Sequence, residues 1–152
     1  MAGIAAALVL AVGCATSKPS EVDRFEASFA RLEDLRVDTL WDDIDCVYFA
    51  YGRGVFSEDP DSLKCDVIGR GAPVPFDEQA LLDFDEVRDA LSVEYASISY
   101  DSDGRVSANT HFASDRCTTF IFRPGYEGPG ELDSGARYTP INRDWFVIDY
   151  CG

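Results

Sequence analysis

Residues 93–112 read VEYASISYDSDGRVSANTHF. Asp101 and Gly104 stand at the first and fourth positions of a type I turn, and glycine adopts the positive φ that closes a short hairpin loop. The stretch therefore predicts a β-hairpin whose loop pairs Asp101 with Arg105. A shorter loop would mix hydrophobic and polar side chains on each face, so the hydrophobic pattern favours this register.

Counting outward from the loop separates the hydrophobic side chains of the hairpin from the polar ones. The predicted pairs on the first face are Tyr100 with Val106, Ile98 with Ala108, and Ala96 with Thr110. Those on the second face are Ser99 with Ser107, Ser97 with Asn109, and Tyr95 with His111. We expect the first face to cover a core and the second to point away from it.

Three further segments have the β-branched and aromatic composition of strands, namely residues 44–51, 117–123 and 145–151. Alternation along 117–123 directs one set of side chains inward, Thr118, Phe120 and Phe122, and the other outward, Thr119, Ile121 and Arg123. Residues 52–76 and 124–144 are rich in glycine and proline, so we expect loops there.

Five cysteines are present, and setting Cys14 aside leaves an even number, Cys46, Cys65, Cys117 and Cys151. An even number is typical of an exported chain with disulfides, and three connectivities are possible. If 117–123 and 145–151 are antiparallel neighbours, Cys117 falls opposite Cys151 and Arg123 opposite Trp145. This register favours a Cys117–Cys151 disulfide and leaves Cys46–Cys65. The spread of the cysteines and a single histidine argue against a metal site, and no cofactor is expected.

Two segments have helical periodicity. Ser20 can cap a helix over residues 20–36, whose apolar stripe is Val22, Phe25, Phe29, Leu32 and Leu35. Residues 77–91 carry a second stripe, Ala80, Phe84, Val87 and Leu91. The expected fold is a single α+β domain over 20–152, with two helices packed on one face of a four- to five-stranded antiparallel sheet and two disulfides.

The first 13 residues, MAGIAAALVLAVG, carry no charge, and their apolar stretch is far shorter than the roughly 20 residues that span a bilayer. They are typical of a signal peptide. The following Cys14 resembles the lipidated cysteine of bacterial lipoproteins, although Ala11 stands where leucine is usual. The resemblance implies a lipidated tether over 14–19 and an outer-membrane lipoprotein facing the periplasm. Cleavage after Ala15 would instead give a secreted protein.

Acidic side chains outnumber basic ones 28 to 13, for a formal net charge of −15. Such a chain repels phosphates, which excludes nucleic acid as a partner. The partners we expect are the membrane, through the lipid anchor, and a cationic protein or a small ligand.

The second face of the predicted sheet offers a candidate ligand site. It gathers an aromatic wall, a titratable donor and charges, from Tyr95, His111, Thr119, Arg123, Trp145 and Asp149. His111 and Asp149 would lie roughly 9–10 Å apart with one strand between them, too far for a catalytic hydrogen bond. No Gly-x-Ser-x-Gly motif occurs either. We therefore expect a binding or envelope-structural role without catalysis.

Residues 134–138, Ser-Gly-Ala-Arg-Tyr, resemble the inhibitory segment of the membrane-bound lipoprotein inhibitors of c-type lysozymes. The resemblance implies that Ser134, Arg137 and Tyr138 contact a basic cell-wall hydrolase, to which an acidic inhibitor would be steered. Those inhibitors are all-β barrels, which differs from the fold expected here. A small carboxylate-dependent hydrolase is the third interpretation.

Overall fold

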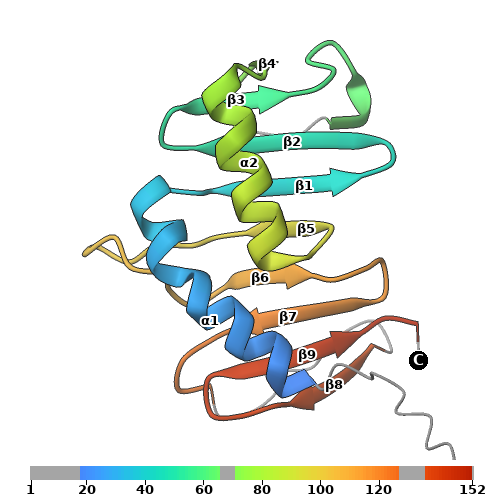
Figure 1. Ribbon diagram of the computed structural model, residues 1–152. Helices are drawn as coiled ribbons and strands as arrows, with labels where there is room; N and C mark the ends of the chain where they lie inside the picture. Colours follow the sequence, from blue (N-terminus) through green and yellow to red (C-terminus); the bar gives the residue numbers. More distant parts are fainter. Residues whose placement is uncertain (1–17, 66–70, 127–135, 152) are drawn as a thin grey trace, which may run out of the picture.

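The computed structural model describes residues 18–65, 71–126 and 136–151. Two helices lie on one face of a sheet that has nine strands among these residues (Figure 1). The helices are α1 (Lys18–Leu35) and α2 (Glu78–Leu91), and a short 3-10 turn, η1, covers Leu63–Cys65. The strands are β1 (Thr39–Asp43), β2 (Cys46–Tyr51), β3 (Gly54–Ser57), β4 (Val74–Pro75), β5 (Tyr95–Ser97), β6 (Thr110–Ala113), β7 (Thr118–Phe122), β8 (Arg137–Pro140) and β9 (Trp145–Asp149).

The strand order is β4-β3-β2-β1-β5-β6-β7-β9-β8. Every neighbouring pair is antiparallel except β3 and β4, which are parallel. The α+β architecture is confirmed, but the expected four to five strands are too few. The segment expected as one strand over 44–51 is β2 alone, paired with the unforeseen β1 through a hairpin turn. The expected loops contain β3, β4 and β8.

Both predicted helices are present, but α1 begins at Lys18, so the predicted Ser20 cap lies inside the helix. The stripe of α2 is buried, and that of α1 is buried except at Phe29 and Leu35, which are partly buried against the same core. Val22, Phe25 and Leu32 of α1 are at most 2% exposed. Asp77 caps α2 by accepting a hydrogen bond from the Ala80 amide at 2.7 Å. Each helix ends where the next residue takes a left-handed conformation, Arg36 after α1 and Ser92 after α2.

The loop of the 93–112 hairpin has the predicted pairing, and Gly104 has the predicted positive φ. The Asp101 amide donates to the Arg105 carbonyl, and Tyr100 bridges to Val106. Closer to the sheet the register shifts by two residues, so that Tyr95 pairs with Ala113 and not with His111.

The shift begins at Asn109, whose φ is 69°, and at Thr110, whose hydroxyl accepts the Ser99 amide at 3.0 Å. Two additional residues therefore bulge out of this strand. Ser97 consequently pairs with His111, and Ala96 with Phe112. Because the shift is even, each side chain keeps its predicted face.

The register between β7 and β9 differs from the predicted one by a single residue. Phe122 pairs with Trp145 and Thr118 with Asp149, where Arg123 had been placed opposite Trp145. An odd shift moves every side chain of a strand to the other face. Trp145 therefore lies among the core residues beneath α1, not on the face that points away from the helices.

Both predicted disulfides, Cys46–Cys65 and Cys117–Cys151, are present, each with Cα atoms 5.2 Å apart. Cys117 is not directly opposite Cys151, because the Tyr150 amide donates to the Cys117 carbonyl. A disulfide spans diagonal neighbours as well as direct ones when the Cα atoms are this close. The pairing was thus correct although the register behind it was wrong.

The described chain consists of two halves with one plan, residues 18–75 and 78–149, in which a helix precedes a set of strands. The halves meet where β1 pairs with β5. The Ile98 amide donates to the Asp38 carbonyl, and the Asp42 amide donates to the Glu94 carbonyl. These two bonds extend the antiparallel β1–β5 pairing by one step at each end.

Each helix covers the strands of the other half (Figure 1). Phe25 of α1 stacks on Phe112 of β6 with ring centroids 4.4 Å apart. Phe84 of α2 packs edge-on against Phe49 of β2 at 5.6 Å. One continuous core therefore joins the two halves.

Candidate binding site on the outer face of the sheet

We call the face of the sheet that points away from α1 and α2 the outer face. Two buried apolar clusters lie on it, one toward each end of the strand order. The first contains Cys46, Tyr48, Ala50 and Cys65, and the second contains Ile121, Phe146 and Ile148. The outer face therefore carries more buried apolar surface than the outward-facing side chains predicted from the sequence.

A depression of about 380 Å³ lies between these two clusters. Its lining comes from five places in the chain, Trp41, Glu94 with Tyr95, Ala113, Asp115 with Arg116, and Thr119. Trp41, Tyr95, Ala113 and Thr119 form one row across β1, β5, β6 and β7, because each pairs with the next. The depression thus depends on the junction between the two halves.

The aromatic wall of the depression is held by the β1–β2 hairpin. The Trp41 and Tyr95 rings are 5.6 Å apart and nearly perpendicular, at 79°. The Trp41 indole donates to an Asp43 carboxylate oxygen at 2.9 Å. The other Asp43 oxygen accepts the amides of Asp45 and Cys46. These hydrogen bonds lower the pKa of Asp43, and the bond from the Trp41 indole has the largest effect. The positive charge of nearby Arg116 lowers it further.

Two acidic side chains stand at the rim. The Glu94 backbone is fixed on both sides, because its amide donates to Ala113 and its carbonyl accepts from Asp42. Asp115 caps a turn by accepting the Cys117 and Thr118 amides at 2.7 and 2.8 Å. Asp115 and Arg116 are exposed, whereas Glu94 is half-buried. The site can therefore offer stacking surfaces, carboxylates and the Thr119 hydroxyl to a ligand.

Three of the predicted site residues lie in or next to the depression. Tyr95 and Thr119 line the depression. His111 is in the neighbouring row, between Ser97 and Ile121. Burial lowers the pKa of His111, which keeps the imidazole neutral at neutral pH. The His111 side chain is half-buried.

The structure does not bring the other three predicted residues to this site. Trp145 is 1% exposed under α1, where its indole donates to Glu26 at 2.8 Å. Asp149 pairs with Thr118, on the side of the sheet that carries the helices. Arg123 lies over the Tyr126 ring at 4.6 Å, beside the second cluster and away from the depression.

The predicted inhibitory segment is divided by the boundary of the described residues. Ser134 lies outside them, and Arg137 is the first residue of β8. Tyr138 packs against Phe146 with ring centroids 4.7 Å apart. Residues 137–140 are therefore a strand paired with β9, not part of a loop. Cys14 and residues 15–17 of the predicted tether also lie outside the described residues, whereas Lys18 and Pro19, the last two residues of that tether, belong to α1.

Five residues that line the depression were not predicted from the sequence, Trp41, Glu94, Ala113, Asp115 and Arg116. Trp41 belongs to β1, a strand of only five residues that ends in two aspartates. An alternating Thr39-Leu40-Trp41 before the Asp-Ile-Asp turn is the local signal that could have indicated it. The pairing of β1 with β5 joins distant parts of the chain and has no local signal.

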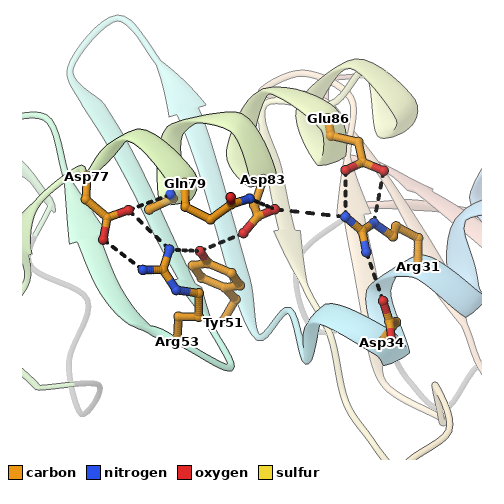
Figure 2. Close-up of polar contacts among 9 residues, drawn as sticks. Arg31, Asp34, Tyr51, Arg53, Asp77, Gln79, Asp83 and Glu86 are labelled. Carbon is orange, nitrogen blue, oxygen red and sulfur yellow. Dashed lines mark hydrogen bonds and ion pairs between the residues drawn. The ribbon is translucent and has the colours of Figure 1, made fainter.

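A second polar cluster lies on the opposite side of the molecule, between the helices and β2 (Figure 2). The Tyr51 hydroxyl donates to Asp83 at 2.8 Å, and Gln79 donates to the other Asp83 oxygen at 3.0 Å. Asp83 is 5% exposed, so these bonds satisfy a buried carboxylate.

Arginines extend this cluster on both sides of Asp83 (Figure 2). Arg53 makes a two-pronged contact with Asp77, at 3.1 and 2.9 Å, and Arg31 makes another with Glu86, at 2.9 and 2.7 Å. The Arg53 contact, followed by the Ala80 amide bond, lowers the pKa of Asp77. Each of these groups is engaged by a neighbour in the fold, so the cluster attaches α2 to β2 and to α1.

The comparisons with known proteins find no matching family model, no matching curated protein and no matching solved structure. Within the described ranges, three or more potential metal-ligating side chains do not gather anywhere. Neither of the described helices is long and apolar enough to cross a membrane. Conclusions about function therefore rest on the geometry of the depression and on the sequence.

Proposed function

We propose that the protein is an exported lipoprotein, anchored through Cys14 on the periplasmic side of the outer membrane, that binds a partner through the outer face of its sheet without catalysing a reaction. The observation that carries the proposal is the depression between two buried apolar clusters, lined by Trp41 and Tyr95. Partly exposed aromatic rings beside charged groups are the composition of a recognition surface.

The proposed localisation rests on the sequence of the first 14 residues and is supported by the two disulfides. Disulfides persist in oxidising compartments such as the periplasm. Mass spectrometry of the membrane fraction should find a mature chain that begins at an acylated Cys14. Recovery of a soluble chain that begins at Thr16 would contradict the anchor.

Binding fits the depression better than catalysis does. Its lining contains no histidine and no cysteine, and the Thr119 hydroxyl has no imidazole beside it in the lining. Nucleophilic catalysis needs a nucleophile within hydrogen-bond reach of a base. The buried carboxylate Asp83 also accepts bonds from Tyr51 and Gln79, so a carboxylate-dependent hydrolase is less well supported there.

Photo-crosslinking in cells tests the binding surface. A photoreactive amino acid at Thr119 places the probe in the depression, and the same residue at Leu82 of α2 is the control, because Leu82 is 58% exposed on the helical side. We expect a defined adduct from Thr119 and none from Leu82. Adducts from Leu82 alone, or from neither position, would contradict binding through the outer face.

The alternative, an acidic inhibitor of a basic cell-wall hydrolase, is favoured by the net charge of −15. The packing of Tyr138 on Phe146 leaves its ring less available to an enzyme than a loop would. An inhibitor should lower lysozyme turnover at low salt, and Arg137→Ala should abolish that effect. Unchanged turnover would eliminate this alternative.

A further inference from the structure

We propose that the depression receives a lysine or arginine side chain of a basic protein. This inference rests on the proposed function and identifies the chemistry of its partner. The described residues that carry it are the two aromatic rings of the wall, Trp41 and Tyr95, and the two carboxylates of the rim, Glu94 and Asp115.

The rings have the arrangement that attracts a cation. An ammonium or guanidinium group is attracted to the face of an aromatic ring, most strongly to tryptophan. Because Trp41 and Tyr95 are nearly perpendicular and 5.6 Å apart, they present surfaces in two directions. The bond from Trp41 to Asp43 fixes the indole, and the Cys46–Cys65 disulfide anchors the start of β2 beside this turn. A rigid wall loses little conformational entropy on binding.

The charges of the lining also favour a cation. Arg116 is the one basic residue of the lining, and its charge acts on Asp43, which lies next to the wall. Glu94 and Asp115 outnumber Arg116, so the charged side chains of the lining leave one excess negative charge, which favours a positive ligand. The net charge of −15 extends this attraction over the approach path.

A side chain of a protein suits this site better than a small molecule. Sites for small molecules bury most of the surface of their ligand. This depression is open rather than enclosed, and Asp115 and Arg116 at its rim are exposed. A basic side chain can fill it while the protein that carries it gains further contacts on the surrounding outer face.

Two other hollows formed by the described residues do not combine an aromatic wall with carboxylates that could meet a cation. The groove between α1 and α2 has a volume of about 150 Å³, and the charges of Arg31 and Glu86 on its edge pair with each other. The hollow beside the Cys46–Cys65 disulfide contains acidic residues but no aromatic ring.

Titration with an octalysine peptide tests the proposal, with a fully acetylated octalysine as the neutral control peptide. Glu94→Gln removes one rim charge, and Glu58→Gln is the matched control, because exposed Glu58 lines the hollow beside the disulfide. We expect octalysine to bind the full mature chain about three- to fivefold more weakly after Glu94→Gln than after Glu58→Gln.

A second pair of variants tests the aromatic wall. Tyr95→Leu should weaken octalysine binding about two- to fivefold, whereas Tyr150→Leu, at a tyrosine that is 55% exposed elsewhere, should not. The thermal midpoint of each variant shows whether it is folded, and Glu94→Gln supplies the decisive comparison if Tyr95→Leu is not.

Equal losses for Glu94→Gln and Glu58→Gln would overturn the proposal, because binding would then follow net charge alone. Equal binding of the acetylated peptide would also overturn it. If Thr119 still forms its adduct in cells after either result, the outer face remains a binding surface for an uncharged partner. If that adduct is absent too, the proposed function fails with it.

Discussion

The interface beneath α1 and the interface beneath α2 solve the same packing problem with different chemistry. Under α1, Phe25 stacks on Phe112 and also contacts Phe120 and Trp145. Under α2, the Tyr51 ring stacks on Phe49, while its hydroxyl bonds to the buried carboxylate Asp83. Two halves with one plan therefore differ in how much of their core is polar.

This difference determines which kind of substitution should destabilise each interface most. An aromatic interface loses stability through the cavity that a smaller side chain leaves. An interface with a buried carboxylate loses stability when the charged group loses a donor, even if the shape is unchanged. The two helices should therefore respond to different mutations.

The largest effect is expected for Phe25→Ala in the α1 interface. Phe25 is fully buried against three aromatic rings, so the cavity should cost about 3–5 kcal/mol of unfolding free energy. Urea denaturation measures the change, and Leu82→Ala, on the exposed side of α2, is the control. A loss below about 1 kcal/mol would mean that α1 is not packed as described.

The next effect is expected for Tyr51→Phe in the α2 interface. The substitution keeps the ring but removes the donor to Asp83, which should cost about 1–3 kcal/mol. Tyr150→Phe, at an exposed tyrosine, serves as the control in the same denaturation experiment. Equal stability of the two variants would show that Asp83 does not depend on the Tyr51 hydroxyl.

A smaller loss of stability is expected at the start of α2 when the pH is lowered. The pKa of Asp77 is lowered in the fold by Arg53, so its contribution to stability is complete above the ordinary carboxyl pKa near 4 and is lost as the pH falls through the lowered value. Asp77→Asn should therefore reduce the loss of stability in acid. Identical acid denaturation curves for wild type and variant would contradict the Arg53–Asp77 contact.

The smallest effect is expected on the outer face. His111→Ala removes a half-buried side chain that lies outside both helix interfaces, and it should cost about 0.5–1 kcal/mol. Thermal unfolding at neutral pH checks this, since His111 is already neutral there. A loss as large as that of Phe25→Ala would place His111 in the core and undo the distinction between the two faces.

Features with a local signal were predictable from the sequence. The stripes of α1 and α2 and the Gly104 turn each depend on residues a few positions apart. Tyr95, Thr119 and His111 were placed on the correct face, because alternation along a strand survives an even shift in register.

Features that depend on pairing between distant segments were not predictable. Placing Cys117 directly opposite Cys151 gave the correct disulfide but a register one residue off, which put Trp145 on the wrong face. The short β1 strand was missed, and with it the wall of the depression at Trp41. Strand pairing between the halves is set by the whole core, not by either strand alone.

The proposed binding surface is the outer face, between its two apolar clusters. Amide NMR spectra of the ¹⁵N-labelled protein titrated with octalysine locate the bound peptide, because they report on every strand and both helices at once. Binding at the outer face should shift the amide signals around Trp41, Tyr95, Ala113 and Thr119 and leave those of α1 and α2 unchanged. Shifts concentrated on the helices, or spread evenly over all acidic surfaces, would contradict it.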